Sequence, residues 1–182
     1  MSRVIAVYGG SFDPPHLAHT LVSAYVLAAH RVDQVLVVPT AQHAFDKRSA
    51  PFEHRLRMCE LAMRDLHRVE ISAIEAQLPR PSLTLRLLEH LQQEHPEAQL
   101  RLVIGTDLLP ETDSWHRFDL VRELAPPLIV PRAGYPDHGL GIASLPAISS
   151  TEVRACLRAG LSTQGLLSPV VADYAQAHAL YR

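Results

Sequence analysis

The chain has 182 residues, of which 47% are hydrophobic and 20% are charged, and its formal net charge at pH 7 is −2. These values are typical of a globular protein with one buried core, and the near-neutral charge argues against a protein that binds nucleic acid or a membrane surface. The sequence has no bilayer-length apolar stretch, no signal-peptide pattern and only two cysteines, Cys59 and Cys156, without metal-motif spacing. We therefore expect a cytoplasmic protein with reduced thiols.

The first predicted elements are a strand over residues 4–8 and a helix over residues 21–29, joined by the loop Gly9-Gly10-Ser11-Phe12-Asp13-Pro14-Pro15-His16-Leu17-Ala18-His19-Thr20. Two glycines at a strand end let the backbone approach a ligand closely, because no Cβ stands in the way. His16 and His19 project from one side of the first helical turn, where free N–H groups stabilise phosphate. A Gly-Gly pair alone is typical of a turn, and a lone histidine here is typical of a solvated surface. The combination predicts a nucleotide site.

Further along the chain, short apolar runs alternate with segments of helical periodicity. We predict strands over residues 35–38, 69–71, 100–104 and 128–130, and helices over residues 52–66, 82–94, 150–159 and 169–179. This alternation predicts one α/β domain over residues 1–182, with a Rossmann-like parallel sheet and helices on both faces. Ligands of such sheets bind beyond the carboxyl ends of the strands. We therefore expect Gly9-Gly10, Pro39-Thr40 and Gly105-Thr106 to lie along one edge.

A run of hydroxyl side chains precedes the helix predicted from residue 150. Ser149 and Glu152 have the spacing of a capping box, in which they satisfy the free N–H groups of the helix start. Ser150 and Thr151 add two hydroxyl groups, and Arg154 adds a planar, charged fork that fits phosphate oxygens. The cap and a triphosphate cradle need the same helix start, so the two interpretations are compatible.

Asp107 and Trp115 form a third cluster, directly after the strand that ends at Gly105. A carboxylate at a strand end suits a ribose hydroxyl or a water bound to Mg²⁺. The only tryptophan of the chain lies in a polar segment, where an exposed indole offers a flat face for stacking an aromatic ring. The alternative is a tryptophan that covers a loop.

The motifs resemble those of a known family. Residues 9–19 are similar to the signature Gly-Gly-(Thr/Ser)-Phe-Asp-Pro-x-His-x-Gly-His of nicotinate- and nicotinamide-mononucleotide adenylyltransferases, except that Ala18 replaces a glycine. Residues 148–154 match the family's Ile-Ser-Ser-Thr-x-(Ile/Val)-Arg at every position. The spacing of Gly105, Asp107 and Trp115 resembles the Gly-x-Asp-(x)₇-Trp pattern of the bacterial nicotinate enzymes, in which the tryptophan stacks on the pyridine ring.

The resemblance implies roles for these residues. The catalytic residues would be His16, His19 and Arg154, and Mg²⁺ would enter bound to ATP. The ATP site would comprise Gly9, Gly10, Ser11, Phe12, His16, His19, Gly105, Asp107, Ser149, Ser150, Thr151 and Arg154. The remaining histidines are scattered, so we expect no structural metal site in the protein itself.

Weaker matches concern the second substrate, for which the resemblance implies Lys47, Thr84 and Trp115. Thr84 lies in a segment similar to the subfamily's Ser-Tyr-Thr, but Leu83 replaces the tyrosine and Arg86-Leu87 replaces the usual Asp-Thr. Ser82 fits equally well as a helix cap, and a solvated loop position fits Lys47 equally well.

The resemblance predicts an enzyme that joins ATP to nicotinate mononucleotide, releasing pyrophosphate and forming the dinucleotide precursor of NAD. Several alternatives stay open. The acceptor could be nicotinamide mononucleotide or phosphopantetheine, the enzyme could be a cytidylyltransferase, or the chain could be a non-catalytic nucleotide sensor. The expected partners are ATP and a pyridine mononucleotide, and the oligomeric state, monomer or homo-oligomer, is not decided by the sequence.

Overall fold

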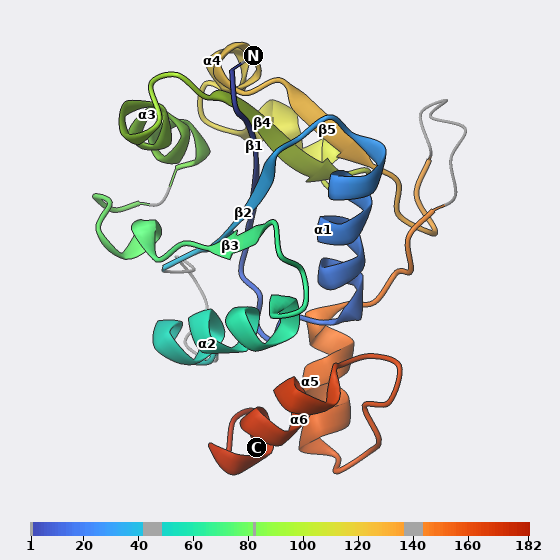
Figure 1. Cartoon of the computed structure of the whole chain (residues 1–182). Coiled ribbons are helices and arrows are strands. Elements are labelled where there is room, and N and C mark those ends of the chain that lie inside the picture. The colour runs from blue at the N-terminus through green and yellow to red at the C-terminus, as the bar shows by residue number, and fades with distance from the viewer. Residues whose placement is uncertain (1, 42–48, 82, 137–143) are drawn as a thin grey trace.

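The fold is built on one parallel sheet. The computed structural model describes residues 2–41, 49–81, 83–136 and 144–182. Its strands are β1 (Val4–Gly10), β2 (Gln34–Pro39), β3 (Val69–Ile71), β4 (Gln99–Gly105) and β5 (Pro127–Val130). They lie in the order β3-β2-β1-β4-β5, and each pair of neighbours is parallel (Figure 1). The predicted α/β class is confirmed. The strand order reverses between β1 and β4, which is where such sheets bind ligands.

Helices cover both faces of the sheet, as Figure 1 shows. The helices of the described residues are α1 (Leu17–Ala29), α2 (Phe52–Met63), α3 (Thr84–Glu94), α4 (Phe118–Leu124), α5 (Ser150–Arg158) and α6 (Pro169–Ala177), of which the first four pack against the sheet. Alternate residues of β1 point to opposite faces. Ile5 and Val7 pack in one core cluster with Leu88 of α3, whereas Ala6 packs in another with Val26 of α1. A strand buried on both faces needs a continuous apolar run, and this explains the sequence of the central strands.

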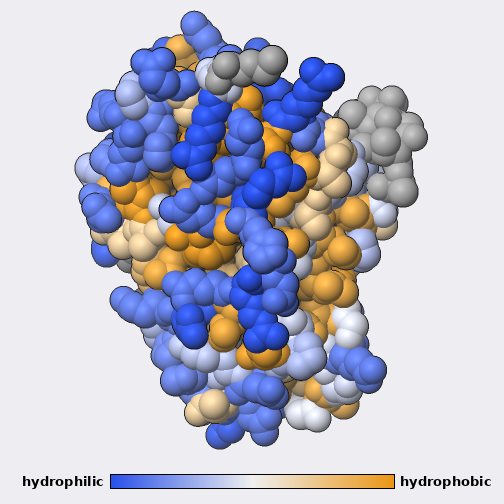
Figure 2. Space-filling view, viewed as in Figure 1, coloured by the Kyte–Doolittle hydropathy of each residue, from blue (hydrophilic) through white to orange (hydrophobic). Residues whose placement is uncertain are grey.

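The C-terminal helices α5 and α6 form a third cluster, which packs on the N-terminal end of α1 and on α2. In Figure 1 they lie below the sheet, next to the loop between β1 and α1. Figure 2 shows hydrophilic side chains spread over the visible face, with hydrophobic patches between them. In the part of the chain that the structure describes, no helix is long and apolar enough to cross a membrane.

Some element boundaries differ from the predicted ones. Helix α1 begins at Leu17 rather than at residue 21, because His16 is already the extended residue before the first helical turn. Helix α3 begins at Thr84, and Ser82 lies outside the described residues. The sequence did not predict α4 or the 3₁₀ helices η1 (Ile74–Ala76) and η2 (Leu109–Ser114). Each is too short to show helical periodicity.

Candidate functional site

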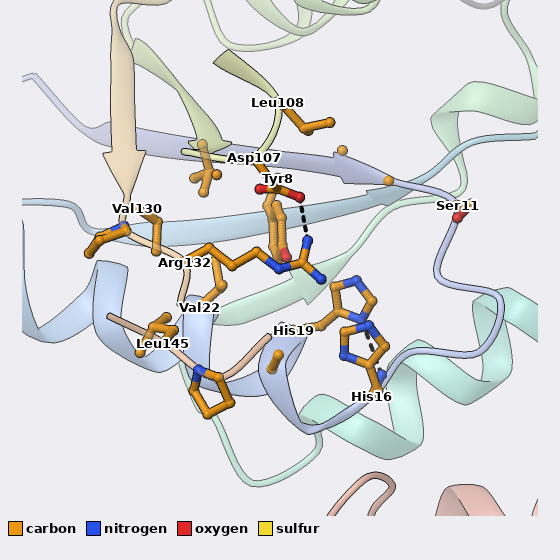
Figure 3. Close-up of a pocket in the computed structure, with 17 residues that line it drawn as sticks. Tyr8, Ser11, His16, His19, Val22, Asp107, Leu108, Val130, Arg132 and Leu145 are labelled. Atoms are coloured by element: carbon orange, nitrogen blue, oxygen red, sulfur yellow. Dashed lines mark hydrogen bonds and ion pairs between the residues drawn. The ribbon is translucent and has the colours of Figure 1, made fainter. Parts of the chain in front are cut away.

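A cavity of about 320 Å³ opens at the carboxyl edge of the sheet, between β1, β4, β5 and the start of α1 (Figure 3). It lies at the reversal of strand order. The predicted site residues in its wall are Gly9, Gly10, Ser11, His16, His19, Gly105 and Asp107. Residues that the sequence analysis did not single out, Tyr8, Leu108 and Arg132 among them, complete the lining. Segments 9–19 and 105–107 are thus brought together as predicted.

The two signature histidines stack on each other, with ring centroids 3.7 Å apart and ring planes 19° from parallel. The backbone N–H of His16 donates to Nδ1 of His19 at 3.1 Å. In a neutral imidazole the other nitrogen then carries the hydrogen, so Nε2 of His19 is a donor. The His16 side chain is only 4% exposed, and its Nδ1 has no hydrogen-bond partner among the described residues. Both rings line the cavity.

Burial keeps these histidines neutral. It lowers the pKa of His16 to about 4, and the nearby charge of Arg132 acts in the same direction. The pKa of His19 lies well below its ordinary value, because of burial first and then the neighbouring His16 and Arg132. Without a ligand, the histidines are therefore hydrogen-bond donors at neutral pH rather than cations. A bound anion would raise both pKa values again.

Arg132 brings the positive charge into the cavity, as Figure 3 shows. Its guanidinium pairs with the carboxylate of Asp107 and donates to the Ile148 carbonyl at 2.8 Å. Its backbone N–H donates to Oγ1 of Thr106 at 3.0 Å. A Cβ at Gly105 would collide with Oδ1 of Asp107, so a larger residue there would force the carboxylate to shift. Asp107, expected near the ribose, is thus already paired with Arg132. The sequence could have pointed to Arg132, because this residue follows the end of β5, at the same carboxyl edge of the sheet.

The loop between β1 and α1 is fixed by aromatic packing. Phe12 is buried with a left-handed φ of 48°, and its ring meets Tyr8 and His19 edge-on at 5.4 and 4.8 Å. A Cβ at Gly10 would lie 3.2 Å from the Phe12 ring. The glycine therefore leaves room for the phenylalanine that supports His19.

Arg55 of α2 contacts the same loop and fixes its backbone. This buried side chain donates to the carbonyls of Ser11 at 2.7 Å and Ala50 at 3.0 Å. Its role could not be predicted from the sequence, because nothing in the local pattern separates Arg55 from other helical arginines.

The start of α5 lies directly against this loop. Ser149 caps the helix and accepts from the Glu152 N–H at 3.2 Å, as its spacing predicts. The Ser150 hydroxyl donates to the Pro14 carbonyl at 3.0 Å. Arg154 donates to the Asp13 carbonyl at 2.7 Å. The two sequence motifs therefore meet in space, although Arg154 is not part of the lining drawn in Figure 3.

The residues expected to hold the second substrate lie apart from this cavity. Trp115 is half-buried, packs against the core on the α3–α4 face, and meets Phe118 edge-on at 5.6 Å. Thr84 is half-buried at the first position of α3. Arg86 donates to the carbonyls of Pro79 and Pro81 at 2.6 and 3.0 Å. Lys47 lies outside the described residues.

The acidic side chains near the cavity are already engaged. Asp107 pairs with Arg132, and Asp13 accepts hydrogen bonds from Ala50 and Tyr181. Among the described residues, no group of three or more His, Cys, Asp or Glu side chains is arranged to hold a metal ion. This donor set fits a Mg²⁺ that is ligated mainly by phosphate oxygens and water, which is how Mg²⁺ commonly binds with nucleotides.

A strand-order reversal, stacked histidines at a helix start and a second hydroxyl-rich helix start define a nucleotidyltransferase of the α/β class. The family model described as cytidylyltransferase-like matches residues 7–156. The chain belongs to this family and, within it, to the nicotinate-nucleotide adenylyltransferases, as the resemblance of its motifs predicted.

Relatives support this assignment along the whole chain. A protein of Anaeromyxobacter dehalogenans, named as a probable nicotinate-nucleotide adenylyltransferase, is 46% identical over 99% of this chain and 97% of its own. A protein of Myxococcus xanthus with the same name is 35% identical over 97% and 94%. The fold matches the nicotinic acid mononucleotide adenylyltransferase of Plasmodium falciparum complexed with NaAD. For that structure the TM-score is 0.83 and the identity 24%, over 98% of this chain and 97% of that one.

Proposed function

We propose that this chain transfers the adenylyl group of ATP to nicotinate mononucleotide, forming deamido-NAD and pyrophosphate in the biosynthesis of NAD. The observation that carries the proposal is the meeting of the His16–His19 pair with the start of α5 at the reversal of strand order. Relatives at up to 46% identity, named as probable nicotinate-nucleotide adenylyltransferases, support the choice of acceptor.

The reaction needs no general base. A phosphate oxygen of the mononucleotide attacks the α-phosphorus of ATP, and the bond from that phosphorus to the bridging oxygen of pyrophosphate breaks. The attacking phosphate is already largely ionised at pH 7, because its second pKa is about 6. Catalysis then consists of aligning two anions and stabilising charge on the transferring group.

The residues of the site fit this task. Nε2 of His19 and the ring of His16 would donate to phosphate oxygens, together with the free backbone N–H groups at the starts of α1 and α5. Arg132 and Arg154 would supply fixed positive charge. A Mg²⁺ ion held by the ATP oxygens would neutralise charge on the pyrophosphate as it leaves.

The acceptor side of the proposal depends on Trp115, whose indole would stack on the pyridine ring. The side chain is half-buried and meets Phe118 with one edge. Nicotinamide mononucleotide and phosphopantetheine are the rival acceptors. A cytoplasmic location belongs to the same proposal and agrees with the free thiols of Cys59 and Cys156.

A non-catalytic sensor is the alternative of a different class. Such a protein needs to bind nucleotide but has no need for donors that act on a transition state. The retention of His16, His19 and Arg154 together favours the enzyme.

Pyrophosphate release tests the proposal. We expect the highest kcat/KM with ATP and nicotinate mononucleotide, and a product with the mass of deamido-NAD. The matched reactions use nicotinamide mononucleotide or phosphopantetheine as acceptor, and CTP in place of ATP. A preference for any of these would contradict the proposed substrates, and nucleotide binding without turnover would favour the sensor.

A further inference from the structure

The last residues of the chain turn back toward the loop between β1 and α1. Ala179 and Tyr181 both have left-handed backbone angles, with φ values of 52° and 66°. The N–H of Leu180 donates to the Ala175 carbonyl at 2.9 Å, which fixes the turn. Residues with a Cβ adopt this conformation rarely, so the surrounding contacts must hold it. The turn places the Tyr181 side chain in the protein interior, where the residue is only 8% exposed.

The Tyr181 hydroxyl donates to Oδ1 of Asp13 at 2.8 Å, across 168 positions of sequence. Asp13 is 3% exposed and lies three residues before His16. The same Oδ1 accepts from the Ala50 N–H at 3.0 Å. Burial and the neighbouring carboxylate raise the pKa of Tyr181, so its hydroxyl remains a donor. The C-terminal turn thus fixes one oxygen of a buried carboxylate in the signature loop.

The other side of Asp13 faces Arg154. Nη1 of Arg154 donates to the Asp13 carbonyl at 2.7 Å but lies 3.6 Å from Oδ2 of the carboxylate. A direct charge-assisted hydrogen bond would be about 2.7–2.9 Å long. The carboxylate is therefore near enough to orient the guanidinium, but it does not form a tight ion pair with it.

We infer that Tyr181 is a positioning residue for adenylyl transfer, because it holds the Asp13 carboxylate so that Arg154 remains oriented and available to phosphate. Without the hydroxyl, Oδ1 loses a donor, and the carboxylate can turn to pair directly with Arg154. That pair would compete with the triphosphate for the guanidinium. The inference rests on the proposed function, since it assigns Tyr181 a part in the same reaction.

The test compares two tyrosines of the C-terminal segment. Tyr181→Phe removes only the hydroxyl at Asp13. Tyr174→Phe is the matched control, since its hydroxyl bonds Nδ1 of His54 at 2.9 Å and joins α6 to α2 away from Asp13. We expect both variants to lower Tm by similar amounts. Only Tyr181→Phe should reduce kcat, by roughly tenfold, and weaken ATP binding several-fold.

A double-mutant cycle separates positioning from general stability. In an Asp13→Asn background, Tyr181→Phe should change kcat by less than about twofold, since the two residues act in one chain of contacts. Wild-type kcat in Tyr181→Phe, equal losses in the two tyrosine variants, or additive losses in the cycle would each overturn the inference.

Failure of the proposed function would be visible separately. If the wild-type protein does not turn over nicotinate mononucleotide, the proposed function is wrong, and calorimetry with ATP still tests Tyr181. A loss of ATP affinity confined to Tyr181→Phe would support its role toward Arg154. Equal ATP affinities in the two variants would refute that role.

Discussion

Two regions of the predicted active site are built in different ways. On the phosphate side, buried and half-buried polar side chains contact residues far away in the sequence, as Arg154 contacts Asp13 and Arg55 contacts Ser11. On the acceptor side, Trp115 packs on the hydrophobic core and meets nearby Phe118. A network of buried hydrogen bonds fixes geometry, whereas a half-buried ring offers contact area. We therefore expect changes on the phosphate side to reduce turnover and changes on the acceptor side to reduce affinity.

The largest effect is expected from His19→Ala. This change removes the Nε2 donor and the acceptor of the His16 N–H, so kcat should fall by about 10²–10³ while KM for ATP changes much less. Steady-state pyrophosphate release measures both constants, and thermal unfolding checks the fold. Thr20→Ala is the control, because its hydroxyl contacts the Ala62 carbonyl instead of the cavity. Near-wild-type turnover in His19→Ala would remove this residue from the mechanism.

Trp115→Ala tests the other side of the comparison. Loss of stacking should weaken binding of nicotinate mononucleotide by about 1–3 kcal/mol, or roughly 5- to 150-fold in Kd, with little change for ATP. Calorimetry with each ligand gives the two affinities. Phe118→Ala is the control, because it removes the ring that packs against the indole edge but leaves the indole itself. Unchanged mononucleotide affinity in Trp115→Ala would end the stacking assignment.

Arg154→Lys keeps the charge but loses the planar fork, so we expect kcat to fall by about tenfold. Arg158→Lys on the same helix provides the comparison, and it should be silent. If the two variants have the same turnover, Arg154 does not act on phosphate.

The neutral histidines predict a pH dependence of stability. The pKa of His16 is about 4 in the folded protein and near 6.5 in the unfolded chain, so between these values the unfolded chain binds the extra proton. The free energy of unfolding should therefore fall as the pH drops from 6.5 to 4, by at most about 1.4 kcal/mol per pH unit from this residue. Urea unfolding of the wild type and of His16→Gln across this pH range measures the contribution of His16 to the free energy of unfolding. Parallel curves for the two proteins would show that His16 is not buried neutral.

The smallest effect is expected from Arg86→Gln. Arg86 replaces a residue of the family's motif near the second substrate, but its guanidinium is bound to the Pro79 and Pro81 carbonyls. The ratio of kcat/KM for the acid and amide mononucleotides should therefore change by less than about twofold. A clear shift of this ratio toward the amide in Arg86→Gln would show that the Arg86 guanidinium lies beside the pyridine ring of the substrate.

Patterns among neighbouring residues predicted the longer strands and helices and the helix cap. They did not predict short helices or side chains whose partners are distant in the sequence. The apolar run of β2 and the cap at Ser149 could be predicted, because burial and helix capping act on neighbouring residues. The seven-residue helix α4 has too few turns to show a period. Arg55 and Tyr181 gain their roles only when the chain folds, since their partners are 44 and 168 positions away. No periodicity or spacing encodes such pairs.

A crystal structure of the protein with deamido-NAD tests the arrangement of the active site most directly. We expect the two phosphates to lie between the His16–His19 pair and Arg154, with the pyridine ring against Trp115. Phosphates bound outside the cavity, or a pyridine ring away from the indole, would contradict this arrangement.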